Sequence, residues 1–323
     1  MDNKNENIGF MKTIKSKQAK VFVWILTILV SLLGMRLHAQ QDPMYTQYMF
    51  NTLSVNPGYA GSFDAISVLG LYRTQWVGLP GAPVTQTFTV HSPVPNKNMG
   101  WGLSLVNDAV GPVHQTQIFV DYSYGLQITP MSKLRLGIKA GIGVYQGNLE
   151  DLRRDVVADP YVFDFKGKML PNIGVGLYYH GERGYVGLAV PKLITTALKV
   201  NNIELGQAKR HWFFIGGYLI DLSESMVFKP SFLVKAVEGA PLSIDLSGMV
   251  YFYEKLGLGV AYRHGAMLSG LINYYITPSF RVGYAYDYTT TPLRNYSNGT
   301  HEFMLGYDFY FKERNKIRSP RFF

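Results

Sequence analysis

Apolar and polar positions alternate along most of this chain with a period of two. In residues 134–145, LRLGIKAGIGVY, apolar side chains occupy every second position, and arginine, lysine and glycine fill most of the others. The alternation recurs in 256–263, 281–288 and 303–311. Because successive side chains of a β-strand point to opposite faces, each segment has one apolar face and one small or polar face.

This pattern predicts fourteen strands separated by turn-forming sequences. They cover residues 65–75, 84–92, 99–107, 114–127, 133–145, 171–180, 184–190, 209–220, 226–236, 241–252, 254–263, 266–276, 279–288 and 300–311. At about 9 to 13 residues, most are longer than the usual five or six and match a tilted membrane-spanning strand. An even count is what bacterial single-chain barrels require.

Two further features favour a membrane barrel over a soluble β-sandwich, which also alternates. Aromatic residues gather at the ends of the apolar faces, as in interfacial girdles: Tyr262, Tyr288, Phe309 and Phe311. The polar faces carry the charged residues Arg135, Lys139, Asp245 and Asp287. These charges would be costly in a sandwich core, whereas a water-filled lumen hydrates them. We therefore predict an all-β fold, a transmembrane antiparallel β-barrel in the outer membrane.

The connections between the strands predict how the barrel is oriented. Every second connection is short, whereas 146–170 and 191–209 are long and 289–300 is moderate. In bacterial barrels the short turns face the periplasm and the long loops face outside. This parity places both termini of the barrel in the periplasm. The run 148–168 is then a solvated outer loop, with partner binding as its alternative role.

The first 39 residues read as a targeting segment. Lys12, Lys15, Lys17 and Lys20 precede the apolar run 21–35, and the small residue Ala39 follows it. These are the parts of a secretory signal, and we expect cleavage after Ala39, with Met11 as a possible true start. An uncleaved anchor helix is the alternative, but the run falls short of the roughly 20 residues that span a bilayer.

Composition narrows the chemistry available to the chain. It has no cysteine, which excludes disulfides, metal–thiolate sites and thiol nucleophiles. Its histidines show no metal-ligand spacing, and no serine lies beside an evident base. The glycines of GIGVYQGN (141–148) lack the spacing of a phosphate-binding loop. We predict a protein that is not an enzyme, with no catalytic, cofactor-binding or metal-binding residues.

Glycines on the polar faces suggest that something occupies the lumen. Gly174 and Gly176 alternate with Val175 and Leu177, so they face inward and leave room for a plug or loop. A barrel of roughly eight strands is filled by its own inward side chains, and one of 16–18 strands encloses an aqueous channel. A barrel of fourteen strands lies between these two sizes. An occupant of the lumen is therefore expected.

The segments that flank the barrel are the unusual parts of the chain. Residues 41–62, QDPMYTQYMFNTLSVNPGYAGS, have no regular period, and Asn56, Pro57 and Gly58 supply turn chemistry. We predict a periplasmic ribbon over 40–64 that is a structural plug, a partner-binding surface or both. The tail 312–323, KERNKIRSPRFF, carries five basic residues and one acidic. It is either a solvated extension of the barrel domain 65–311 or a docking site for an acidic partner, and nucleic acid is not expected in this compartment.

Several motifs together resemble one known family. They are the ribbon 41–62, the block YRTQWVGLPGAP (72–83), the T-P turn before SFRVGYAYDY, HEFMLGYDF (301–309) and the ending RSPRFF. These look like the PorP/SprF family, outer-membrane proteins of the type IX secretion system and gliding machinery of Bacteroidetes. The similarity covers essentially the whole chain after the signal. Thr52 and Ser54 stand where the family often has more apolar residues.

The resemblance implies an accessory or cargo-receptor barrel in type IX secretion, with adhesin export for gliding motility as one possible task. Its expected partners are the periplasmic ring and translocon components, secreted cargo with a C-terminal secretion domain, and outer-membrane lipid. Candidate partner-binding residues are Tyr45, Tyr48, Phe50, Asn56, Pro57, Tyr59, Arg73, Trp76, Arg318, Arg321 and Phe323. A general diffusion porin or solute channel is the alternative, followed by an outer-membrane lipid-modifying enzyme.

Overall fold

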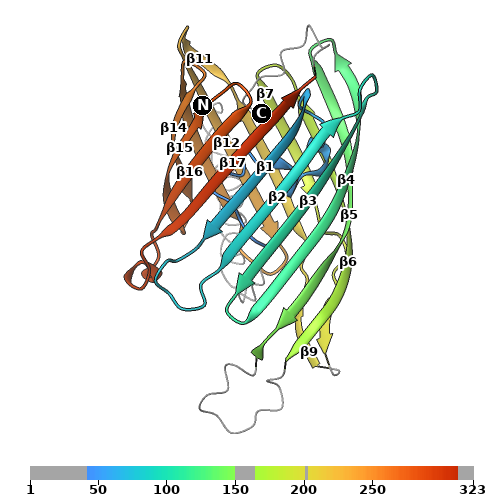
Figure 1. Cartoon of the computed structure of the whole chain (residues 1–323), viewed down its shortest axis with the longest axis vertical. Coiled ribbons are helices and arrows are strands. Elements are labelled where there is room, and N and C mark those ends of the chain that lie inside the picture. The colour runs from blue at the N-terminus through green and yellow to red at the C-terminus, as the bar shows by residue number, and fades with distance from the viewer. Residues whose placement is uncertain (1–41, 150–163, 201–202, 312–323) are drawn as a thin grey trace, which may run out of the picture. The chain divides into compact units, whose positions relative to one another are not determined.

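The computed structural model describes residues 42–149, 164–200 and 203–311. The signal segment 1–39 and the tail 312–323 lie outside the described residues, as does much of the first long loop. Predictions about them stay predictions. The described strands form a closed antiparallel β-barrel (Figure 1).

Fourteen strands make the barrel wall, as the sequence predicts. They are β1 (Ala65–Thr74), β2 (Val84–Pro93), β3 (Met99–Val110), β4 (Val113–Thr129), β5 (Ser132–Gly147), β6 (Phe165–His180), β7 (Gly184–Val190), β10 (His211–Tyr218) with β11 (Ile220–Ser223), β12 (Met226–Val237), β13 (Ser243–Phe252), β14 (Leu256–Arg263), β15 (Met267–Tyr275), β16 (Phe280–Thr289) and β17 (Thr300–Tyr310). Each pairs with its neighbours in sequence. The pairing of β1 with β17, and of β10 with both β7 and β12, closes the ring.

The structure departs from the predicted strands in three places. The predicted strand 209–220 is interrupted at the buried Leu219, which separates β10 from β11. The predicted loop 191–209 contains a hairpin, β8 (Ala197–Val200) and β9 (Ile203–Gln207), whose strands are too short for period two to stand out. Strands β4, β5 and β6 are 17, 16 and 16 residues long, so this part of the wall is longer than predicted.

The two rims of the barrel differ. The first residue of β1, Ala65, pairs with Tyr310 at the end of β17, so the barrel begins and ends at one rim (Figure 1). Every connection at this rim is a short turn, and we call it the turn rim. The other, the loop rim, carries the long connections together with short ones such as the turn between β3 and β4. Which side of the membrane each rim faces stays a prediction.

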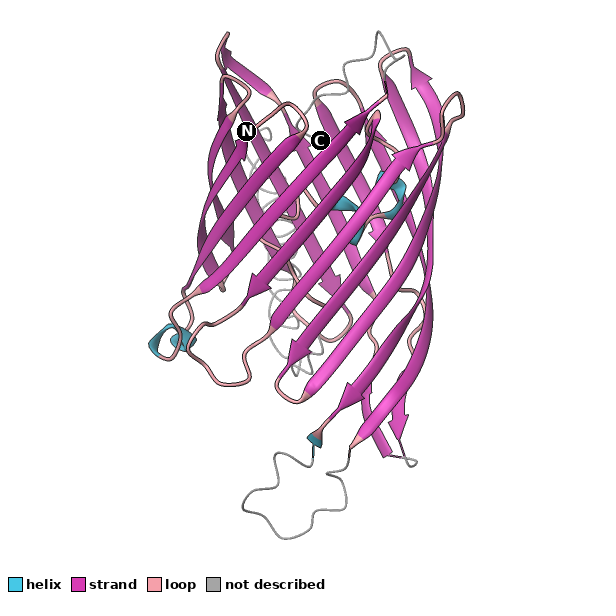
Figure 2. Ribbon diagram, viewed as in Figure 1, coloured by secondary structure: helices cyan, strands magenta, loops and turns pink. Residues whose placement is uncertain are grey.

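Little of the chain is helical (Figure 2). The short helix α2 (Thr52–Val55) and the 3-10 turn η1 (Pro57–Tyr59) lie inside the ring of strands, and η3 (Pro292–Asn295) lies in the connection between β16 and β17. Among the described residues, no helix is long and apolar enough to span a membrane.

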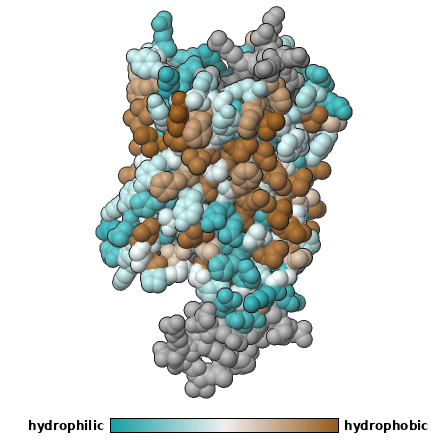
Figure 3. Space-filling view, viewed as in Figure 1, coloured by the Kyte–Doolittle hydropathy of each residue, from teal (hydrophilic) through white to brown (hydrophobic). Residues whose placement is uncertain are grey.

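The outer face of the wall is apolar, and brown side chains dominate the middle of the barrel in Figure 3. Ile138, Val260 and Leu305 are more than half exposed there, although their strands are internal to the sheet. Tyr262 and Tyr288 point outward as predicted. Such an extensive exposed apolar surface on a folded chain requires lipid to cover it.

We predict that Val260→Arg destabilises the barrel in lipid by about 2–4 kcal/mol, because Val260 faces outward near the middle of β14 and an arginine there must be moved out of hydrocarbon. The matched control is Ile276→Arg, just beyond the end of β15, where the expected cost is about 0–1 kcal/mol. Urea titration in vesicles, followed by the heat-dependent gel shift of folded barrels, measures both. Equal costs at the two sites would argue against a lipid-facing wall.

Candidate functional site

Residues 42–64, here called the plug, fill the lumen. Tyr48, Met49 and Leu53 are almost fully inaccessible and belong to one hydrophobic cluster with inward side chains of the wall. The turn η1 packs against β4, β5, β6 and β7. The lumen of this barrel is therefore packed as a protein core is packed, with the chain's own N-terminal segment as the filling.

Glycines of the wall make room for the plug. A Cβ atom at Gly137 would overlap the backbone of Pro57 and Gly58, and one at Gly100 would overlap the carbonyl of Ala60. Four other inward glycines lie against the plug in the same way: Gly102, Gly176, Gly187 and Gly283. The predicted reason for inward glycine, close approach of a plug to the wall, accounts for these positions.

Polar contacts hold the plug to β4, β5 and β6. The Asn56 amide donates to the carbonyl of Leu177 at 2.9 Å and accepts from the Gly58 N–H at 2.8 Å, which fixes the Asn-Pro-Gly turn. Ser123 donates to the carbonyl of Ala60. The Gly58 N–H and the Ala60 carbonyl, backbone groups of the plug that belong to no strand, thereby have hydrogen-bond partners.

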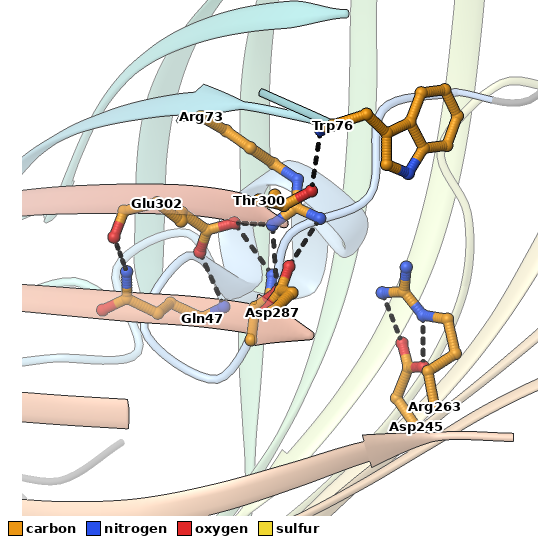
Figure 4. A network of polar contacts seen from close by, with 9 residues as sticks. Gln47, Arg73, Trp76, Asp245, Arg263, Asp287, Thr300 and Glu302 are labelled. Atoms are coloured by element: carbon orange, nitrogen blue, oxygen red, sulfur yellow. Dashed lines mark hydrogen bonds and ion pairs between the residues drawn. The ribbon is translucent and has the colours of Figure 1, made fainter. Parts of the chain in front are cut away.

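A buried ionic cluster holds the other end of the plug (Figure 4). Arg73 on β1 bonds to Asp287 on β16 and to Glu302 on β17, each at 2.8 Å. Glu302 also accepts the backbone N–H groups of Thr46 and Gln47 at 2.9 and 2.8 Å. The Thr46 hydroxyl donates to Asp287 at 2.8 Å.

The charges in this cluster explain why the plug is bound. One guanidinium faces two carboxylates, so the wall alone carries an uncompensated negative charge in a site at most 2% exposed. The plug supplies two amide donors and a hydroxyl donor, and hydrogen bonds to a charged acceptor are worth more than neutral ones. Withdrawal of the plug would remove these three donors and leave Arg73 as the partner of both carboxylates.

A third contact ties the start of the plug to the wall. Asp42 bonds to Lys192 at 2.6 Å and lies 3.5 Å from a ring nitrogen of His211 on β10. Burial raises the pKa of the Asp42 carboxyl, but Lys192 and His211 outweigh burial and hold that pKa below its usual value. The carboxylate is therefore charged at neutral pH, and the contact is ionic.

The aromatic residues of the plug act as neutral polar anchors. Tyr45 shares a hydrogen bond of 2.6 Å with Thr87, and Tyr48 shares one of 3.1 Å with Ser247. Burial raises the pKa of both phenols, so they stay protonated. Each ring fills space among apolar neighbours while its hydroxyl finds a partner on the wall.

The structure brings most of the predicted site residues together. Tyr45, Tyr48, Phe50, Asn56, Pro57, Tyr59 and Arg73 are all buried at the boundary between plug and wall. Trp76 is half-buried at the loop rim, where its backbone N–H donates to Thr300 and its indole points away from the ionic cluster (Figure 4). Arg318, Arg321 and Phe323 lie outside the described residues. That any of these contacts a partner stays a prediction.

The expectation of hydrated charges in a wet lumen is wrong. Arg135, Lys139, Asp245 and Asp287 are all at least 95% buried. Lys139 bonds to Asp121 at 3.1 Å, Asp245 to Arg263 and Asp287 to Arg73. Ion pairs thus accommodate three of the four charges, while Arg135 donates a hydrogen bond to the Ser123 hydroxyl.

Sequence reasoning missed the wall residues that receive the plug. Glu302 and Thr300 belong to no motif of known chemistry, and Thr46 and Gln47 are ordinary polar residues in the ribbon. The available signal was register: Arg73 lies opposite Glu302 once β1 is paired with β17. That signal requires knowing that the first and last strands meet.

We predict that Gly137→Ala unseats the plug near Asn56 and costs about 1–3 kcal/mol, as overpacking of a tight core does. Gly270→Ala is the control, because Gly270 is also an internal strand glycine but has open space on the lipid side. Urea midpoints of the two variants, compared with the parent, test this. A Gly137 variant as stable as the Gly270 variant would contradict close packing of the plug.

Glu302→Gln is expected to loosen the plug at Thr46 and Gln47, with a loss of about 1.5–3 kcal/mol, because their N–H groups then donate to a neutral acceptor while Arg73 keeps its bond to Asp287. Asp245→Asn is the matched control, since it neutralises another carboxylate paired with an arginine, one that bonds to Arg263 on the neighbouring strand. The readout is maleimide labelling of a single cysteine at Ser54, possible because the chain has none of its own. Labelling should rise in the Glu302 variant only; equal labelling in both would refute the anchor.

Comparison with known proteins places the chain in a family. Residues 37–307 match the family model described as type IX secretion system membrane protein PorP/SprF. No curated protein gives a significant match.

Several solved structures resemble the barrel. Omp33 of Acinetobacter baumannii is 10% identical over 77% of this chain and 99% of that chain, with a TM-score of 0.42. The CymD monoaromatic hydrocarbon channel is 13% identical over 88% and 97%, with a TM-score of 0.48. A Pseudomonas aeruginosa FadL homologue is 11% identical over 83% and 95%, with a TM-score of 0.45. Because the family model covers most of the chain, this plugged barrel belongs to the PorP/SprF family of type IX secretion system membrane proteins and is an outer-membrane protein.

Proposed function

We propose that the protein is a non-catalytic accessory component of type IX secretion that receives cargo and contacts the machinery without conducting cargo through its own lumen. The expected cargo carries a C-terminal secretion domain, and the expected machine contacts are the periplasmic ring and the translocon. One observation carries the proposal: the lumen is filled by residues 42–64, whose side chains are buried against the wall.

The strength of the plug's attachment supports a receptor rather than a conduit. The plug is covalently continuous with β1 and is held at Asp42, at Thr46 and Gln47, and at Asn56. Opening a passage would require breaking ionic contacts with the wall and exposing a large apolar cluster at the same time. Such a rearrangement has to replace each of these polar contacts and also expose the apolar side chains of the cluster to water.

The environment of the inward histidines supports a role without catalysis. His91 packs edge-on against Tyr59 and receives the Gly61 N–H, and His211 stacks on Phe213 while facing Asp42. In the part of the chain that the structure describes, neither ring is hydrogen-bonded to a serine hydroxyl. In both cases the imidazole takes part in packing the plug against the wall.

The placement of the barrel's ends supports contact with a periplasmic machine. The start of β1 and the end of β17 meet at the turn rim, so the plug's exit and the basic tail both depart from that rim. With the predicted orientation, residues 61–64 and the start of the tail lie on the periplasmic side, whereas the long connections and Asp42, at the start of the plug, lie at the rim that faces outside.

The test combines gene deletion with a locked plug. A Cβ atom at position 58 would lie 3.0 Å from the Cβ of Tyr178, so a small shift brings the pair into the disulfide range of about 3.5–4.5 Å. Gly58→Cys with Tyr178→Cys should therefore crosslink plug and wall in the oxidising periplasm. We expect deletion of the gene to remove a set of adhesins or other cargo from the cell surface, and the locked variant to restore them.

Tyr178→Cys alone is the control, because it carries the same truncation without the crosslink. Normal surface display after deletion would overturn a secretion role. Failure of the locked variant, with rescue by the single variant, would mean that cargo crosses this lumen. Planar-bilayer recording of the purified protein addresses the porin alternative: a large, steady conductance that the crosslink abolishes would favour it.

A further inference from the structure

A small cavity lies at the turn rim beside the exit of the plug. It has a volume of about 50 Å³ and is bounded by residues 61–64 and by the turns that follow β2, β4 and β6. A space of this size holds several water molecules or one carboxylate group with its hydration. The basic residues Lys97, Lys133, Arg135 and His180 line it, with Asp64 and Glu182 as the acidic ones.

Arg135 is the deepest charged group in this cavity. Its side chain is 3% exposed, and one guanidinium nitrogen donates to the Ser123 hydroxyl at 2.7 Å. Its Nε is buried without a hydrogen-bond partner in the described part of the chain. Gly100 on β3 and Gly125 on β4 leave room for the Arg135 guanidinium. A Cβ atom at Gly100 would lie 2.7 Å from it, and one at Gly125 would lie 3.1 Å from it.

The other inward arginines of the wall differ from Arg135 in having a carboxylate partner. Arg73, Arg263 and Arg281 each bond directly to a carboxylate, as Figure 4 shows for the first two. Within the described residues, no carboxylate lies within 4.0 Å of the Arg135 guanidinium; Asp64, which lines the same cavity, attracts it from a longer distance. A buried cation with spare donors is costly unless an acceptor completes it.

We propose that the Arg135 cavity binds a carboxylate of an acidic peptide segment from a partner protein on the turn-rim side. A guanidinium can hold a carboxylate through two parallel hydrogen bonds, and Lys97 and Lys133 at the mouth add attraction. The basic tail departs from the same rim, so both features select an acidic partner. This proposal deepens the proposed function. It depends on that function only in assigning the partner to the secretion machinery.

The position of the cavity favours a peptide over a lipid. Arg135 points into the barrel, whereas its neighbour Leu136 faces the lipid side. A phosphate headgroup attached to acyl chains therefore lies on the wrong side of the wall. Met99 and Met131 also line the cavity and suit the apolar parts of a polypeptide.

The binding test uses purified protein in detergent. Met131, which lines the cavity and is 63% exposed, is replaced by cysteine and labelled with an environment-sensitive fluorophore. The probes are acetyl-Ala-Glu-Ala-amide, its glutamine counterpart and inorganic phosphate. We expect a saturable change with the glutamate peptide and a weaker response to the other two.

Arg135→Gln should weaken binding of the glutamate peptide about tenfold or more, as the loss of a hydrogen bond between charged groups does. Arg183→Gln is the matched control, because Arg183 lies in the turn after β6 but pairs with Asp221 in solvent. Lys97→Gln, at an exposed position, should weaken binding severalfold and keeps the test informative if the Arg135 variant does not fold.

Each other outcome overturns the proposal. No saturable response, an equal response to the glutamine peptide, or unchanged binding by the Arg135 variant would refute a carboxylate site. Tighter binding of phosphate than of the glutamate peptide would identify a phosphate site instead. Because the assay contains no cells, its failure is separate from a failure of the secretion phenotype.

Discussion

The ionic cluster of Arg73, Asp287 and Glu302 is the interaction on which the interior of this barrel depends. It places a net negative charge inside the wall, and the backbone amides of the plug at Thr46 and Gln47 complete it. Without its plug the barrel would lose the donors that complete this cluster and the apolar side chains that pack against the inward wall residues. Wall and plug are therefore a single folding unit, although only the wall has regular secondary structure.

Each strand of this wall satisfies two environments at once. Its outward positions carry large apolar side chains such as Ile138 and Leu305, which hydrocarbon covers. Its inward positions carry glycine where the plug's backbone approaches, and charge where a partner is available, as at Lys139 and Asp121. The residue types at the inward positions of the wall therefore reflect where the plug approaches and where a charged partner is present.

The fold could be predicted from the sequence because the alternation of apolar and polar residues is visible within each strand by itself. Fourteen strands, their inward and outward faces and the presence of an occupant in the lumen could be predicted, whereas the break at Leu219 could not. Arg73 was a candidate from its motif, but its partners were not, since Glu302 is 229 residues away and meets it only through barrel closure. Lys139, Asp245 and Asp287, which were expected to be hydrated, are paired because the register between strands brings each beside a residue of the other charge; Arg135, the fourth, is buried without such a pair.

The location of the ionic cluster couples plug insertion to closure of the barrel. Arg73 lies on the first strand and Glu302 directly opposite it on the last, so the two residues meet only when the ring is complete. Asp287 joins from the adjacent β16, and the plug's amides bind to the set formed by all three strands. An open sheet offers the plug an incomplete anchor, whereas a closed one offers its full hydrogen-bonding set. The closing seam and the occupant of the lumen thereby stabilise each other, which places the most strongly bound part of the plug at the join between the chain's first and last strands.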